Sequence, residues 1–205
     1  MPTISTLIFD FGDVFINLDK HGAMTNALQL FAIEDFTHDM LKTNEDFETG
    51  VASREAFIGF YKNKFKHLEE SQILNAWNYI IKDFPQYRLE FLQTLKDQGK
   101  YNLILLSNTN ALHIEYIKET VPFFEDFKNC FDGFYLSHEI GLRKPTTEIF
   151  EFIITENHLN TDQCLFIDDT KENTDTAVQM GFHVWNINKT SEDVVDLFSI
   201  KKELF

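Results

Sequence analysis

Four short apolar runs, each stopped by a polar residue, constrain the fold of this chain most strongly. The runs and their stops are Leu7–Phe9 before Asp10, Leu103–Leu106 before Ser107, Phe131–Leu136 before Ser137 and Leu165–Ile167 before Asp168. Apolar strands that alternate with helix-length stretches are typical of a parallel sheet covered on both faces. We therefore predict an α/β fold with a Rossmann-like parallel sheet and helices on both faces. The four polar stops then share the carboxyl edge of the sheet, where such folds place their sites.

The interval between the first two runs is too long for one crossover. About 97 residues separate Asp10 from Ser107, whereas a strand-helix-strand crossover takes roughly 30. The surplus has apolar residues at helical spacing, such as Phe57 and Tyr61 after a candidate N-cap at Ser53. We predict a helical bundle at 20–84, inserted after the first strand of a core formed by 1–19 and 85–205. Such an insert over the carboxyl edge can act as a lid.

Charge and composition limit the partners. The chain has 18 Lys and Arg against 33 Asp and Glu, a net charge of −15, so a polyanion such as nucleic acid is repelled at long range. A single small anion is not excluded, because a few local cations can reverse the field in one cleft. No apolar run approaches the roughly 20 residues of a membrane span, and no basic residue precedes Lys20 as in a signal peptide. With only two cysteines and no metal-binding Cys pattern, we expect a cytoplasmic protein.

Carboxylates at two of the strand ends point to a metal. Asp10 alone would be read as a turn or N-cap residue. Asp168 and Asp169, however, are adjacent carboxylates after another strand, and such a pair in a cleft repels itself unless a cation lies between the two groups. Oxygen ligands of this kind suit Mg²⁺, which shares its coordination with water and phosphate.

Groups suited to an anion follow the same edge. Ser107 and Asn108 offer a hydroxyl, an amide and backbone N–H groups near the start of a helix expected at about Asn110. Lys144, within Gly141–Pro145, adds a cation, although by itself it could equally be a solvated surface lysine. Together these residues indicate a phosphate-binding site beside the metal.

The four segments, in this order, resemble the motifs of the haloacid dehalogenase superfamily, whose members are mostly aspartate-nucleophile phosphatases. The strings Ser107–Asn110, Gly141–Pro145 and Phe166–Asp169 are close to the branch that contains α-D-glucose-1-phosphate phosphatase. The resemblance covers nearly the whole chain, and the insert is placed like that family's type-1 helical cap.

The resemblance implies roles for individual residues. Asp10 matches the nucleophile that forms an aspartyl phosphate, Ser107 and the backbone amide of Asn108 match the phosphate clamp, and Lys144 matches the charge-neutralising lysine. The resemblance also implies a Mg²⁺ site in which Asp169 matches the principal ligand. Asp10 and the Gly12 carbonyl complete the coordination, while Asp168 and Asn173 act on the ion through water.

One position departs from the family pattern. A second aspartate, the general acid and base, usually lies two residues after the nucleophile, and this chain has Gly12 there. Asp13, one residue later, is a candidate for the role. The alternative is that its carboxylate only fixes the tight turn after the first strand.

Three functions remain open from the sequence. The leading one is a Mg²⁺-dependent phosphatase of a small phosphomonoester, such as a sugar phosphate like glucose 1-phosphate. The second is a dehalogenase-type hydrolase, which needs no metal and leaves Asp168 and Asp169 without a purpose. The third is a non-enzymatic binding protein, for which Gly12 is the sequence support. The sequence does not indicate an oligomeric state.

Overall fold

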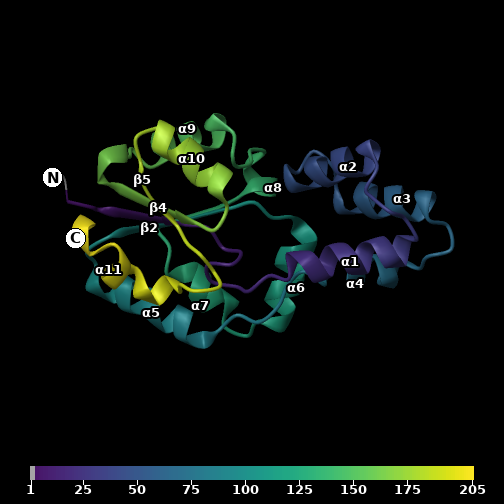
Figure 1. Ribbon diagram of the computed structural model, residues 1–205, viewed down its shortest axis with the longest axis horizontal. Coiled ribbons are helices and arrows are strands. Elements are labelled where there is room, and N and C mark those ends of the chain that lie inside the picture. Colours follow the sequence, from purple (N-terminus) through teal and green to yellow (C-terminus); the bar gives the residue numbers. More distant parts are fainter. Residues whose placement is uncertain (1–2) are drawn as a thin grey trace.

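A computed structural model describes residues 3–205 and contains one sheet of five parallel strands, in the order β3-β2-β1-β4-β5 (Figure 1). The strands are β1 (Thr6–Phe9), β2 (Asn102–Ser107), β3 (Gly133–Leu136), β4 (Cys164–Asp168) and β5 (His183–Asn186). The predicted parallel sheet is confirmed. Because every strand runs in the same direction, Asp10, Ser107 and Asp168 reach the same edge.

Helices cover both faces of the sheet. In β1, Leu7 and Phe9 belong to one apolar cluster and Ile8 to another, because successive strand side chains point to opposite faces. The first cluster packs under α5 (Gln86–Gln98), α6 (Ala111–Thr120), α7 (Phe124–Asn129) and α11 (Leu197–Ile200). The second packs under α9 (Thr147–Glu156) and α10 (Lys171–Gln179), while the short α8 (Ser137–Ile140) follows β3. Single 3₁₀ turns occupy Thr161–Gln163, Val194–Asp196 and Lys202–Leu204.

Four helices stand apart from the sheet with their own apolar core (Figure 1). They are α1 (Lys20–Phe31), α2 (His38–Glu48), α3 (Arg54–Lys64) and α4 (Glu70–Asn78). Aromatic rings fill this core, and those of Phe47 and Phe57 stack with centroids 4.3 Å apart. We call these four helices the cap, and we retain 20–84 as its proposed extent.

Two chain segments join the cap to the core, and they lie side by side. The amide of Asn17 donates to the carbonyl of Asp83 at 2.9 Å, and that of Asp19 donates to Ile80 at 2.9 Å. Between them, Leu18 and Ile81 form an antiparallel bridge. The cap therefore connects to the core through one paired, strand-like joint.

The sequence pattern predicted helix ends correctly but missed one strand. Ser53 caps α3 by accepting from the amide of Ala56, and Gly99 ends α5 in a left-handed conformation, as the residue types predict. The edge strand β5 was missed, because its first two residues are only half-buried and do not form an apolar run. None of the helices in residues 3–205 is both long and apolar enough to cross a membrane.

Gly50 lies where the cap backbone comes close to the backbone of the core. It has a φ of +69°, and a Cβ at this position would collide with the carbonyl oxygen of His138 on α8. Gly50→Ala should therefore lower the free energy of unfolding by about 2 kcal/mol, from backbone strain plus the clash. Gly59, within α3, has open space around its missing Cβ, so Gly59→Ala should raise stability by roughly 0.5–1 kcal/mol. Urea unfolding of both variants checks the pair; equal shifts of the same sign would contradict it.

Candidate active site

The ammonium of Lys144 lies fully buried at the carboxyl edge of the sheet. Its Nζ is 2.9 Å from Oδ1 of Asp10 and 2.6 Å from Oδ2 of Asp168. Burial acts to lower the pKa of Lys144, but the two carboxylates outweigh it and raise the pKa above its ordinary value. The two carboxylates therefore favour the charged form of Lys144, and the sequence alternative of a solvated surface lysine is wrong.

Asp10 follows β1 directly and is held from the neighbouring strand, because its amide donates to the carbonyl of Ile167 at 2.9 Å. Burial raises the pKa of its carboxyl, and the Lys144 ammonium opposes that shift. A carboxylate that is poorly solvated and accepts from only a few donors is a better nucleophile than one in water, provided that a nearby cation keeps it ionised.

Asp168 pairs with Lys144 and does not line the cleft. In addition to the ammonium, its Oδ2 accepts from Nδ2 of Asn173 at 2.9 Å, and its Oδ1 accepts from the amide of Thr170 at 2.8 Å. Both oxygens therefore already have protein donors. Asn173 donates to Asp168 and fixes its orientation, and its orienting of a metal-bound water stays a prediction.

Asn108 holds the backbone of Lys144 in place. Its side-chain amide donates to the carbonyl of Lys144 at 2.8 Å, and its Oδ1 accepts from the amide of Lys144 at 2.9 Å. The loop that carries the lysine is thus bound to the end of β2. Ser107, the last residue of that strand, is buried and lines the cleft.

A cavity of about 530 Å³ lies between this edge and the cap. The polar residues that the core places in its wall include Asp10, Ser107, Asn108, Lys144, Asp169 and Asn173. The cap side and the joint contribute Lys20, Glu48, Ile80 and Ile81. The structure therefore brings the sequence-predicted residues around one cleft, with Gly12 also in its wall and Asp13 and Asp168 outside it.

The acidic residues fit a divalent metal in their donor chemistry. Asp10, Asp168 and Asp169 can each offer one carboxylate oxygen, and these three atoms lie within 4.8 Å of one another. An all-oxygen set of this kind suits Mg²⁺. Because the oxygens of Asp168 accept from Lys144, Asn173 and Thr170, Asp10 and Asp169 are the carboxylates better placed to hold an ion directly.

Asp13 does not have the surroundings of an acid and base, and this prediction needs correction. Its carboxylate is buried, accepts from the amide of Leu18 at 2.9 Å and pairs with the ammonium groups of Lys189 at 2.6 Å and Lys20 at 3.0 Å. Burial acts to raise its pKa, but these donors lower it below the ordinary value. With a φ of +57°, Asp13 fixes the turn after β1, which was the alternative weighed for it.

Five ionisable residues of the cleft were not assigned by the sequence: Lys20, Glu48, His113, Arg143 and Glu172. Arg143 stands beside Lys144 in its motif, and its Nη2 lies 3.1 Å from Oε2 of Glu48 on the cap. Lys20 and Glu48 reach the cleft because the cap packs over it, and His113 reaches it from the core helix α6; none of them follows a strand end. One feature of the sequence could have pointed to Lys20: it is the first basic residue of the chain and lies at the boundary of the insert.

His113 links the core helix α6 to the cap helix α4. Its Nδ1 faces Nδ2 of Asn110 at 3.1 Å and its Nε2 faces the carbonyl of Trp77 at 3.1 Å. An imidazole that accepts at Nδ1 and donates from Nε2 satisfies both contacts, so the neutral form fits. Burial lowers the pKa of His113 to about 4, against the opposing hydrogen bond to Trp77.

The shift at His113 predicts a pH dependence of stability. The unfolded chain takes up a proton near pH 6.5, whereas the folded chain does so near pH 4, so stability is lost as the pH falls through this window. His113→Gln should remove on the order of 2 kcal/mol of that loss. Urea unfolding between pH 4 and 7 measures it, with His67→Gln at an exposed position as the control. A slope unchanged by His113→Gln would refute the assignment.

Comparison with known proteins agrees with this geometry. Residues 4–181 match the haloacid dehalogenase-like hydrolase family. D-ribitol-5-phosphate phosphatase of Bacteroides thetaiotaomicron is 28% identical over 195 residues, covering 89% of this chain and 91% of the relative.

Two solved structures share the whole architecture. A haloacid dehalogenase family enzyme of Bacteroides thetaiotaomicron, in complex with magnesium and inorganic phosphate, has a TM-score of 0.81 and 29% identity, covering 95% of this chain and 99% of that one. A predicted hydrolase of the same kind from Porphyromonas gingivalis has a TM-score of 0.83 and 25% identity over 98% of both chains. The chain therefore belongs to the haloacid dehalogenase-like hydrolase family.

Proposed function

We propose that this protein is a Mg²⁺-dependent phosphatase that hydrolyses a small phosphorylated polyol or sugar through an aspartyl phosphate on Asp10. The observation that carries the proposal is the Asp10 carboxylate in the wall of the cleft, 2.9 Å from a buried ammonium. A phosphatase relative and a related structure that holds magnesium and phosphate give it further support.

The residues of the cleft divide the reaction between them. A carboxylate oxygen of Asp10 attacks phosphorus, the bond from phosphorus to the substrate oxygen breaks, and water then hydrolyses the acyl phosphate and restores the carboxylate. Lys144 neutralises charge on Asp10 and on the phosphoryl group. The Ser107 hydroxyl and the backbone amide of Asn108 hold the phosphoryl oxygens. Asp10, Asp169 and the Gly12 carbonyl would hold Mg²⁺, which supplies positive charge to the phosphoryl oxygens when bound.

The leaving oxygen needs a proton, and Asp13 is not placed to give one. Glu48 is the cap carboxyl in the wall of the cleft. Burial raises its pKa, although the nearby Arg143 opposes the shift. A proton donor needs a suitable pKa and must come within hydrogen-bond reach of the leaving oxygen, and we propose Glu48 for this role because it is the cap carboxyl that lines the cleft.

The size of the cleft supports a small substrate. A volume of about 530 Å³ is within the usual range for small-molecule sites, and the cap restricts access by a macromolecule. The sequence resemblance favoured glucose 1-phosphate, which the comparisons do not support. The relative named for D-ribitol 5-phosphate moves the expectation toward an open-chain polyol phosphate.

The two other functions from the sequence receive less support. A dehalogenase needs no divalent metal, which would leave Asp169 without a role at the edge of the cleft. A binding protein needs no nucleophile held beside a buried lysine. Hydrolysis of p-nitrophenyl phosphate with Mg²⁺, and its loss in chelator, separates the three functions. A panel of ribitol 5-phosphate, glucose 1-phosphate and a phosphopeptide then tests the substrate class.

Asp10→Asn should abolish turnover while the fold is retained, because the amide has nearly the same shape but is a poor nucleophile. We expect a loss of at least about a thousandfold in kcat, measured with p-nitrophenyl phosphate and Mg²⁺, and an unchanged circular dichroism spectrum. Activity above a tenth of the wild-type value would remove Asp10 from the nucleophile position.

Substitutions at Asp168 and Asp169 should have different effects, one on stability and the other on the Mg²⁺ requirement. Asp169→Ala should raise the Mg²⁺ concentration needed for activity at least tenfold with little change in stability. Asp168→Ala leaves a buried ammonium with one carboxylate and should cost about 3–5 kcal/mol of stability. Thermal unfolding and Mg²⁺ titration of activity measure both variants. If Asp168→Ala is as stable as the wild type, the ion pair between Asp168 and Lys144 does not stabilise the fold.

A further inference from the structure

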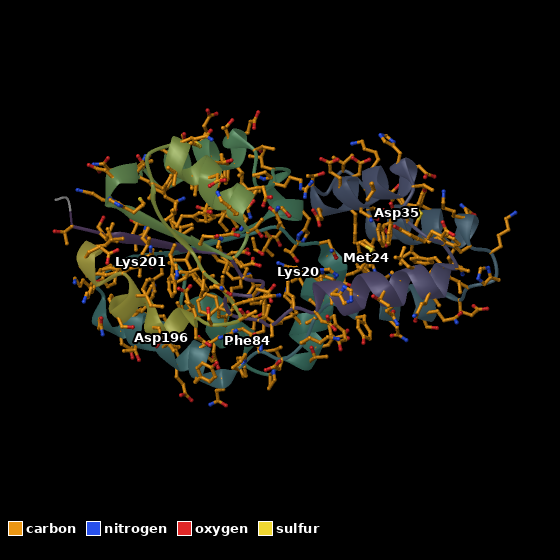
Figure 2. All side chains as sticks on the ribbon, in the orientation of Figure 1. Lys20, Met24, Asp35, Phe84, Asp196 and Lys201 are labelled. Atoms are coloured by element: carbon orange, nitrogen blue, oxygen red, sulfur yellow. The ribbon has the colours of Figure 1, made fainter. Side chains whose placement is uncertain are left out.

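Lys20 is the cation through which the cap contacts the acidic cluster. It is the first residue of α1, directly after the joint, and Figure 2 shows it between the cap and the core. Its Nζ lies 2.7 Å from Oδ2 of Asp169 and 3.0 Å from Oδ2 of Asp13. The first of these contacts falls on a carboxylate proposed to hold Mg²⁺.

The two carboxylates differ in what else they contact. Asp13 also pairs with Lys189 at 2.6 Å and accepts from the amide of Leu18, so it stays satisfied if Lys20 moves away. Asp169, within residues 3–205, has Lys20 as its ion-pair partner and a long 3.3 Å contact with the hydroxyl of Thr170. Lys20 and a metal ion would therefore compete for Asp169, whereas Asp13 has a second ion-pair partner in Lys189.

We propose that Lys20 is a positioning residue that competes with Mg²⁺ for Asp169 and so couples metal binding to the start of the cap. The inference rests on the proposed function, since it takes Asp169 as a ligand of Mg²⁺. A monovalent and a divalent cation at one carboxylate repel each other strongly at such distances. Binding of Mg²⁺ then drives the ammonium off Asp169. By reciprocity, a cap position that withdraws Lys20 raises the affinity for Mg²⁺.

The displaced ammonium has space to occupy. The side chain of Lys20 is about half exposed, at 49%, and its four-carbon stem is flexible. It lines the cleft of about 530 Å³ and also an adjoining cavity of about 230 Å³ within the cap. Turned into the cleft, the ammonium meets the anionic end of a phosphomonoester, so occupation by Mg²⁺ frees a cation for the phosphate.

Calorimetric titration of Mg²⁺ into the full chain tests the competition without reference to turnover. Lys20→Met removes the charge and keeps the length, so its Kd for Mg²⁺ should fall about three- to tenfold. Lys20→Arg keeps the charge and should bind Mg²⁺ as the wild type does. Lys189→Met is the matched control, because Lys189 pairs with Asp13 but not with Asp169, and its Kd should change less than about twofold.

A second titration follows the freed ammonium. With saturating Mg²⁺, Lys20→Met should bind inorganic phosphate at least about threefold more weakly than the wild type and than Lys189→Met. Circular dichroism verifies the fold of each variant, and Lys20→Gln replaces Lys20→Met if methionine prevents folding.

The outcomes separate the inference from the function on which it rests. If the wild type hydrolyses p-nitrophenyl phosphate with Mg²⁺ but Lys20→Met binds Mg²⁺ equally or more weakly, the competition is wrong and the proposed function stands. If the wild type neither binds Mg²⁺ nor hydrolyses the phosphoester, both are wrong.

Discussion

A single buried ammonium sets the conditions for the whole site. Lys144 lies between Asp10 and Asp168, and a buried charge is tolerated only with well-placed partners. The parallel sheet supplies those partners, because β1 and β4 pair in register, with Phe9 opposite Ile167. The next residues of both strands, Asp10 and Asp168, therefore emerge side by side. The interior of the fold thus determines which carboxylates can reach the lysine.

The ion-paired aspartates and lysines beside the cleft nearly balance in charge, and the charge that is left over matters for what binds there. Four carboxylates (Asp10, Asp13, Asp168 and Asp169) face three ammonium groups (Lys20, Lys144 and Lys189). The cluster retains one negative charge, which attracts a divalent cation and repels a phosphate dianion. Metal and phosphate should accordingly bind in a cooperative manner, because a metal ion reverses the sign of the local field. The net charge of −15 makes this local reversal necessary for an anionic substrate.

The sequence could predict what the strands determine and little of what the cap determines. Asp10, Ser107 and Asp168 were found because each ends an apolar run, and strand direction alone places them on one edge. Lys20 and Glu48 were not found, since their place depends on how two apolar cores pack against each other, which no local pattern encodes. Asp13 shows the limit at shorter range: proximity to Asp10 along the chain suggested chemistry, but a positive φ turns its carboxylate toward Lys189.

The contacts between cap and core are unequal in strength, and this indicates where the cleft opens. At the joint, backbone hydrogen bonds pair Asn17 with Asp83 and Asp19 with Ile80. At the far side, Arg143 pairs with Glu45 and Glu48 through partly exposed side chains, and such pairs contribute roughly 0–1 kcal/mol each. Breaking the Arg143 pairs therefore costs little, whereas separation at the joint breaks backbone pairing. A cap that rotates about the joint would therefore open at Arg143 and Glu48, while the backbone pairing of the joint is kept.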